Sequence, residues 1–263
     1  MKTQSNFRSG ANKILATVLF MVGGLSLSAV PASGQSQHVK NIILVHGAFV
    51  DGSGWRSVYE ILTKKGYHVT VAQLPLTSLK ADVDATNRIL DKQDGPVILV
   101  GHSLGGLIIT EAGMHPKVAR LVYVAAFQLD KDENILQWLP AFPTAPESGV
   151  LPPDDKGFVY YDRAKFHAGF CADVNSADAD FMFASQKPVA GQSFADKLSN
   201  IAWRSKPSYG IVALGDKTIN PDLERKLYQR GNAKITEIQS SHAVFLSHPN
   251  EVAKVIMDAA EGK

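Results

Sequence analysis

The sequence predicts an α/β fold whose central sheet is mostly parallel and doubly wound, with an additional segment inserted late in the chain. From about residue 38 onward, short apolar runs alternate with stretches of helical spacing. The runs are apolar throughout, which is typical of parallel strands that are buried on both faces. The 263 residues suffice for one large domain, and a hydrophobic content of 45% is enough for a substantial core.

Six segments rich in β-branched and aliphatic residues are expected to form the strands. They are "KNIILVHG", "HVTVAQL", "PVILVGHS", "ARLVYVAAF", "SYGIVALGD" and "KITEIQ". Helices are expected at residues 55–65, 78–92, 104–115, 221–230 and 249–260. Pro221 and Pro249 suit the first turn of a helix, where the missing N–H has no partner to lose. This order predicts helices on both faces of the sheet.

Residues 127–203 interrupt the alternation of strands and helices. They hold five prolines between residues 140 and 153, and twelve of the 22 Phe, Trp and Tyr residues of the chain. A structureless loop of this length is uncommon in a compact domain. We therefore expect an inserted cap over the strand ends and call these residues the cap segment. Most of its aromatic side chains should form a small core, and some should line a pocket.

The first 34 residues are predicted to be a secretory signal peptide. Lys2, Arg8 and Lys13 precede the apolar run "ILATVLFMVGGLSLSAV", and the small residues of "PASGQ" follow it. This order of basic, apolar and small residues is typical of export signals.

Cleavage after Ala32 or Gly34 fits the preference for small residues before the cut and leaves a single domain at residues 35–263. A permanent membrane anchor is the alternative for residues 14–30, but this stretch would be a short and weak span. We expect an exported protein, periplasmic or secreted, without a stable membrane anchor.

Removing the predicted signal peptide leaves 24 Lys and Arg residues against 25 Asp and Glu. This balance offers no basic surface, so no nucleic-acid partner is expected. The single cysteine, Cys171, should be a buried bystander. Glu111 and His115 lie four residues apart and are expected to form a surface pair, and no motif of metal-ligand spacing predicts a metal site.

The motif "GHSLG" is the strongest chemical signal in the chain. It satisfies G-x-S-x-G and lies between a buried-type strand and a helix, which is the setting of a nucleophile elbow. Such a turn exposes Ser103 in a strained conformation, while Gly101 and Gly105 remove crowding and Gly106 lets the helix pack closely. The alternative is a serine that only caps the helix.

A serine nucleophile needs a base and a third group that orients the base. His242 follows the last predicted strand, in the loop expected beside the elbow. Asp216 ends the preceding strand, which suits the acid, because the order on this type of fold is Ser, acid, His. Asp130 is the rival acid, and Asp222 lies within the next helix, where it suits the N-terminal dipole.

The developing negative charge in acyl transfer needs two backbone donors. The N–H of Leu104, just past the nucleophile, is the first candidate. The N–H of Ala48 in "VHGAFVDGSGW" is the second, because this loop follows the first strand. The alternative is a plain loop whose Ser53 caps the next helix.

These residues resemble the α/β-hydrolase superfamily over essentially everything after the signal peptide. The pairing of "VHGAFVDGSGW", "GHSLGG", "LGDKTINPDLER" and "SSHAVFLSHP" is similar to plant methylesterases, hydroxynitrile lyases and their bacterial esterase relatives. The resemblance implies an α/β-hydrolase fold with Ser103, Asp216 and His242 as the triad and Ala48 and Leu104 as oxyanion donors. It also implies a cap over the pocket and no cofactor.

Two positions depart from the lyase branch, which carries a threonine at the position of Gly47 and a lysine at that of Ala243. A lyase needs that lysine cation for the departing cyanide, so hydrolysis of small carboxylic esters through an acyl-enzyme is favoured. The alternatives are a cofactor-free lyase or oxygenase on the same fold, and a non-catalytic protein that binds a small ligand.

Overall fold

The computed structural model describes residues 38–263. The predicted signal peptide and the alternative of an anchor at residues 14–30 therefore lie outside the described residues. Within residues 38–263, no helix is long and apolar enough to cross a membrane.

The six predicted strands and five predicted helices are all present. The strands are β1 (Asn41–Val45), β2 (His68–Val71), β3 (Val97–Ser103), β4 (Val118–Ala126), β7 (Ser208–Ala213) and β8 (Lys234–Ile238). The helices between and after them are α1 (Arg56–Lys64), α2 (Leu79–Asp91), α3 (Gly105–Ala112), α7 (Pro221–Arg230), α8 (Val244–Ser247) and α9 (Pro249–Glu261), with a short 3-10 helix η1 (Gly52–Trp55) before α1.

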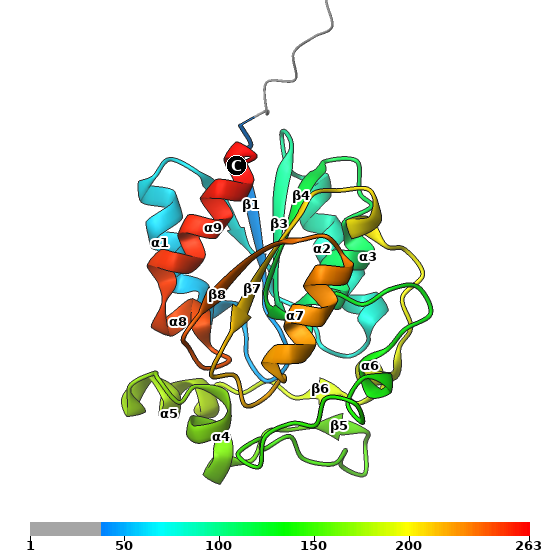
Figure 1. The fold of residues 1–263 in the computed structure, drawn as a ribbon, viewed down its shortest axis with the longest axis vertical. Helices are drawn as coiled ribbons and strands as arrows, with labels where there is room; N and C mark the ends of the chain where they lie inside the picture. Colours follow the sequence, from blue (N-terminus) through cyan, green and yellow to red (C-terminus); the bar gives the residue numbers. More distant parts are fainter. Residues whose placement is uncertain (1–37) are drawn as a thin grey trace, which may run out of the picture. The chain divides into compact units, whose positions relative to one another are not determined.

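The strands form one sheet in the order β2-β1-β3-β4-β7-β8, and every neighbouring pair is parallel. Helices α1 and α9 cover one face, while α2, α3 and α7 cover the other (Figure 1). The prediction of a doubly wound α/β sheet is confirmed.

The apolar runs predict that every strand is buried on both faces. This prediction is correct only for the middle of the sheet. All residues of β1, β3 and β7 are buried. In β2 and β8, His68, Lys234 and Glu237 are exposed, and most other positions are half-buried. These two strands form the edges of the sheet, where helices cover the faces incompletely, so the prediction is wrong for them.

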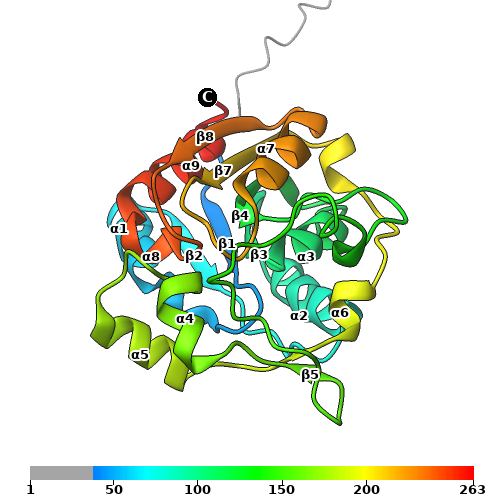
Figure 2. The ribbon, with the colours of Figure 1, turned by 60° about the horizontal axis from the view of Figure 1, so that its bottom comes forward.

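The cap segment contains short elements of its own. They are η2 (Ile135–Gln137), β5 (Phe158–Val159), α4 (Arg163–Phe170), α5 (Ser176–Ala184), β6 (Val189–Ala190), α6 (Gln192–Ala195) and η3 (Ala202–Arg204). Strands β5 and β6 pair in an antiparallel manner. Figure 2 shows this part of the chain lying across the ends of the central strands.

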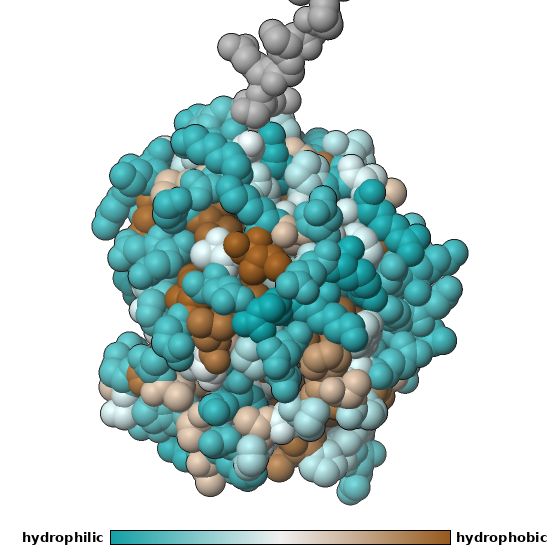
Figure 3. All heavy atoms as spheres, in the orientation of Figure 1, coloured by the Kyte–Doolittle hydropathy of each residue, from teal (hydrophilic) through white to brown (hydrophobic). Residues whose placement is uncertain are grey.

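The surface in Figure 3 is mostly hydrophilic, with hydrophobic residues in smaller groups. Several large hydrophobic side chains of the cap segment are exposed nevertheless. Leu136 is 50% exposed, Val150 43% and Leu151 42%. Because the core of the cap segment leaves these three in solvent, they are available to contact a bound molecule.

The order of the strands reverses direction between β1 and β3, since the chain runs from β1 to β2 on one side and continues with β3 on the other. In open α/β sheets, ligands bind in the crevice at the carboxyl ends of the strands at such a reversal. The loop after β1 and the end of β3 are therefore the places from which the functional site is built.

Candidate active site

Ser103 is the last residue of β3 and has a φ angle of +54°, in the left-handed region. This conformation is strained for a residue with a side chain and turns the chain sharply into α3. A Cβ at Gly101 would lie 2.5 Å from the carbonyl oxygen of Gly105, and one at Gly106 would lie 2.2 Å from that of Phe127. The glycines are thus required by the close approach of strand and helix, as the elbow motif predicts.

Asp216 and His242 form a buried pair from the loops after β7 and β8. Their side chains are both fully buried, and Nδ1 of His242 donates to Oδ2 of Asp216 over 2.5 Å. Oδ1 of Asp216 accepts two further bonds, from the backbone N–H of Thr218 at 2.6 Å and of Ile219 at 2.8 Å. Three donors stabilise the ionised carboxylate, which in turn fixes the tautomer of the imidazole.

The other ring nitrogen of His242 is free to act as a base. Nε2 is buried and has no hydrogen-bond partner among the described residues, so no bond joins it to Ser103 in this structure. The His242 ring lies 4.6 Å from the ring of His102 and 4.8 Å from that of Phe170. Since His102 directly precedes Ser103 in β3, the imidazole of His242 lies close to the end of the strand that carries Ser103.

Two further histidines hold the backbone of the site. Nε2 of His102 donates to the carbonyl oxygen of His242 over 3.0 Å, which requires the proton on that nitrogen. Burial, followed by the neighbouring His242, lowers the pKa of His102 well below its usual value. Nε2 of His46 accepts from the N–H of Leu74 at 3.1 Å, so its Nδ1 donates to the carbonyl oxygen of Gly47 at 2.9 Å.

Burial lowers the pKa of His46 to about 4, so this ring stays neutral at physiological pH. It connects the loop after β1 to the loop after β2, and Ala48 follows the contacted Gly47 directly. Ala48 and Leu104 both line the same cavity as Ser103. The residues that carry the predicted oxyanion donors therefore line the same cavity as Ser103.

This cavity has a volume of about 490 Å³ and lies between the sheet and the cap segment. Besides Ser103, its walls from the sheet side include Phe49, Thr218 and Ile219, and Phe127 lies where β4 leads into the cap segment. The cap segment contributes Ile135, Leu136, Leu139, Thr144, Ser148, Val150, Leu151, Pro153, Val159, Gly191 and Phe194. No lining residue among residues 38–263 carries a charged side chain.

The rival acids have other partners. Asp130 forms an ion pair with Arg204 over 2.7 Å, and Asp222 lies in the first turn of α7 and pairs with Arg225. Neither contacts His242 in the described structure, so Asp216 alone fits the role of the acid.

The prediction that Glu111 and His115 form a surface pair is wrong. Helix α3 ends at Ala112, so His115 is not one helical turn away, and its ring pairs with Asp91 instead at 3.2 Å. The Glu111 carboxylate accepts hydrogen bonds from Asn200, including one from Nδ2 at 2.9 Å.

Cys171 is buried, as expected, and burial raises the pKa of its thiol to about 12. It carries no thiolate at physiological pH.

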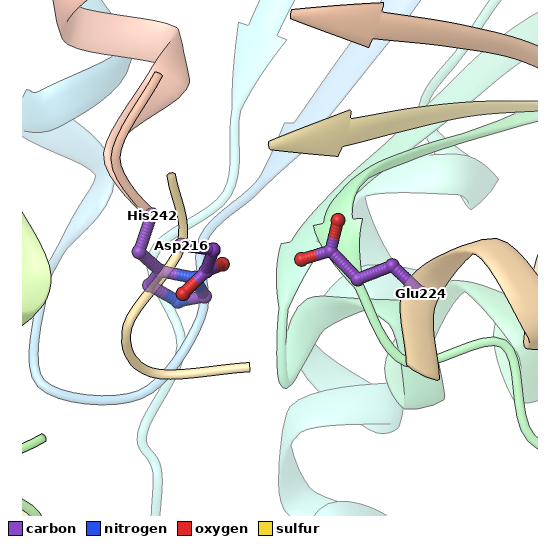
Figure 4. A group of neighbouring side chains, drawn as sticks. All are labelled: Asp216, Glu224 and His242. Carbon is purple, nitrogen blue, oxygen red and sulfur yellow. The ribbon is translucent and has the colours of Figure 1, made fainter. Parts of the chain in front are cut away.

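One group of metal-ligand residues occurs among the described residues. Asp216, Glu224 and His242 are buried, and their ligand atoms lie within 4.8 Å of one another. In Figure 4 the Glu224 side chain extends from α7 toward the other two. Nδ1 of His242 and both oxygens of Asp216 already have hydrogen-bond partners, so a metal ion would have to replace these bonds. We assign no metal to this group.

Sequence patterns did not identify three residues of the site: His102, Asp173 and Glu224. Asp173, in the cap segment, accepts from Ser240 Oγ at 2.8 Å and from the N–H of Ser241 at 3.1 Å, which ties the cap to the loop of His242. The contacts of His102 and Asp173 join positions far apart in the chain, whereas the position of Glu224 depends on how α7 packs against β7. Of the three residues, only His102 could have been noticed from the sequence, because it is next to Ser103.

Comparisons with known proteins identify the family and the fold. Residues 42–255 match the model of a family described as the alpha/beta hydrolase family. The chain is 24% identical to a pyrethroid hydrolase of Sphingobium wenxiniae, over 85% of this chain and 88% of that protein. It is 26% identical to salicylic acid-binding protein 2 of Nicotiana tabacum, over 84% of this chain and 97% of that protein.

Among solved structures, polyneuridine aldehyde esterase superposes with a TM-score of 0.74 at 18% identity, covering 84% of this chain and 99% of the other. A pyrethroid hydrolase structure gives a TM-score of 0.74 at 24% identity, covering 85% and 98%. At such identities these structures establish the fold alone, whereas the family model matches most of the sequence. The chain belongs to the alpha/beta hydrolase family.

Proposed function

We propose that the protein is a serine-dependent hydrolase of small carboxylic esters that works through an acyl-enzyme intermediate. The observation that carries this proposal is the buried pair of Asp216 and His242, in which Nε2 has no partner within residues 38–263 and the ring lies 4.6 Å from that of His102, the residue before Ser103. Relatives named as a carbendazim hydrolyzing esterase and a pyrethroid hydrolase support ester hydrolysis.

In the proposed reaction, Nε2 of His242 takes the proton of the Ser103 hydroxyl as its oxygen attacks the ester carbonyl. Asp216 stabilises the imidazolium that forms. The backbone N–H groups of Ala48 and Leu104 stabilise the oxyanion of the tetrahedral intermediate. His242 then returns the proton to the departing alcohol, and a water molecule repeats the sequence on the acyl-enzyme.

The walls of the cavity favour an uncharged and largely apolar substrate. A charged group that entered a cavity without charged lining residues would lose its hydration without gaining a partner. A volume of about 490 Å³ admits a small or medium-sized ester. The exposed side chains of Leu136, Val150 and Leu151 extend the apolar surface at the cavity.

The alternative of lyase chemistry finds no support at the residue after the base. Ala243 is fully buried, and its N–H donates to the carbonyl oxygen of Phe170 over 3.1 Å. A cation that could stabilise a departing anion is absent from this position and from the described cavity lining.

We also propose that the protein is exported after removal of the first 34 residues. The basic and apolar order of that segment supports this proposal. Expression of the full chain, followed by N-terminal sequencing of the mature protein, tests it. An uncleaved protein in the cytoplasmic fraction would contradict export.

The test of the function is the release of p-nitrophenol from short-chain esters by the protein that begins after Gln35. We expect turnover in the wild type and a loss of several orders of magnitude in Ser103→Ala and in His242→Ala. Asp130→Asn serves as the matched control, since its carboxylate pairs with Arg204 away from the site. Activity that survives Ser103→Ala would contradict the serine mechanism.

A further inference from the structure

The carboxyl group of Glu224 is directed toward Asp216, the proposed catalytic acid. Glu224 is completely buried in α7, and one of its carboxyl oxygens lies within 4.8 Å of ligand atoms of both Asp216 and His242. The direction of the side chain toward the pair is visible in Figure 4. The mechanism proposed above does not use this group, although it lies against the pair that orients the base.

Two ionised carboxylates cannot share such a site without a cation, because like charges at this distance in a buried environment repel strongly. One of the two groups must therefore hold a proton. Asp216 accepts three hydrogen bonds from N–H donors. Glu224 accepts one, from the N–H of Ala213 to Oε2 at 3.0 Å, and its Oε1 has no partner among the described residues. The proton therefore belongs on Glu224.

We propose that Glu224 is a positioning residue that acts as a neutral carboxylic acid, with its O–H directed toward Asp216. The buried pair then carries a single negative charge, located on the carboxylate that holds His242. An ionised Glu224 would add a second negative charge and would compete for the imidazolium. This inference rests on the proposed function for its kinetic consequence, but not for the protonation itself.

The groups around Glu224 agree with a neutral acid. Burial, together with the charge of Asp216, raises the pKa of Glu224 well above its usual value. The neighbouring Tyr228 is itself buried and neutral, and its hydroxyl donates to the carbonyl oxygen of Ala126. The positive charge of Arg225 acts against this rise of the pKa, but its guanidinium is paired with Asp222 and Glu237.

Infrared difference spectroscopy of the wild type against Glu224→Gln tests the protonation at pH 7. We expect the wild type to show the C=O stretch of a protonated carboxylic acid, shifted in D₂O, which the variant lacks. Asp222→Asn is the matched control from the same helix, because its carboxylate is exposed and ion-paired; it should remove only carboxylate bands. Loss of carboxylate bands in Glu224→Gln, with no acid band, would overturn the proposal.

The kinetic consequence is tested by two substitutions. Glutamine is neutral, retains an acceptor for Ala213 and offers an N–H to Asp216, so kcat should stay within about threefold of wild type. Glu224→Leu offers no donor and should lower kcat on the order of tenfold with KM unchanged. A loss in Glu224→Gln as large as in Glu224→Leu would show that a charge is required and would overturn the proposal.

Failure of this inference is distinguishable from failure of the proposed function. The infrared band does not depend on turnover, so it decides the protonation state even if Ser103→Ala leaves activity unchanged or Glu224→Leu does not fold. An acid band in an inactive wild type would support the neutral Glu224 and contradict only the esterase proposal.

Discussion

Asp82 is predicted to destabilise the native protein at neutral pH, and removing its charge should reveal this cost. The residue is fully buried in α2, where Oδ1 accepts from the N–H of Leu76 at 2.8 Å and Oδ2 has no partner among the described residues. Leu76 has a φ of +57°, and its carbonyl oxygen accepts from Ala190 of β6. The contact therefore supports the loop to which the cap segment is attached.

Burial raises the pKa of Asp82 from 3.8 to about 6. Because the folded value exceeds the unfolded one, the stability contributed by the protonated group is fully present below pH 3.8 and is lost as the pH rises through 6. At pH 7 the loss amounts to about 3 kcal/mol, since each pKa step is worth about 1.4 kcal/mol. Asp82→Asn keeps an acceptor for Leu76 but has no charge to bury.

We expect Asp82→Asn to raise the free energy of unfolding by about 2–3 kcal/mol at pH 7 and to leave it nearly unchanged at pH 4. Urea unfolding followed by circular dichroism at pH 4, 5.5 and 7 measures this difference. Asp84→Asn is the control, since Asp84 lies on the same helix but pairs with Lys80 in solvent, and should change stability by less than about 0.5 kcal/mol. A gain that is the same at all three pH values, or a loss at pH 7, would refute the reasoning.

Three further substitutions or treatments probe the site. In Gly47→Thr, the new Cβ would lie 2.7 Å from that of Ser103. We therefore expect the turnover of p-nitrophenyl esters to fall at least tenfold, which corresponds to on the order of 1.4 kcal/mol, while the circular dichroism spectrum stays unchanged. Full activity of the variant would contradict this crowding. Asp173→Ala removes the hydrogen-bond acceptor of Ser241. We expect thermal unfolding to show a loss of stability of about 1–3 kcal/mol and steady-state kinetics to show a lower kcat. An unchanged melting temperature would contradict a stabilising role of the hydrogen bonds between the cap segment and the loop of His242. Cys171 should not react with a thiol reagent at pH 8 until urea unfolds the protein, because burial raises its pKa to about 12; rapid reaction of the native protein would show that the cap segment opens.

Local patterns in the sequence were sufficient to predict the framework of the fold. Apolar runs and helical spacing depend on neighbours within a few residues, so the strands, the helices and the turn at Ser103 could be located without tertiary contacts. The choice of Asp216 and His242 followed from strand order, and the structure brings these two together. The catalytic roles of all three residues stay predictions.

Only the tertiary structure decided which groups surround Asp216 and His242 and which residues of the cap segment line the cavity. The proximity of Glu224 to Asp216 and His242, the hydrogen bonds from Ser240 and Ser241 to Asp173, and the uncharged cavity walls all depend on how separate elements pack together. Whether helices cover β2 and β8 also depends on the position of these strands at the edges of the sheet. The apolar pattern of a strand does not predict its position in the sheet. The sequence shows that a carboxyl group is present but not whether it is protonated. Its protonation depends on the distance to the nearest charge, and the packing of the folded chain determines that distance.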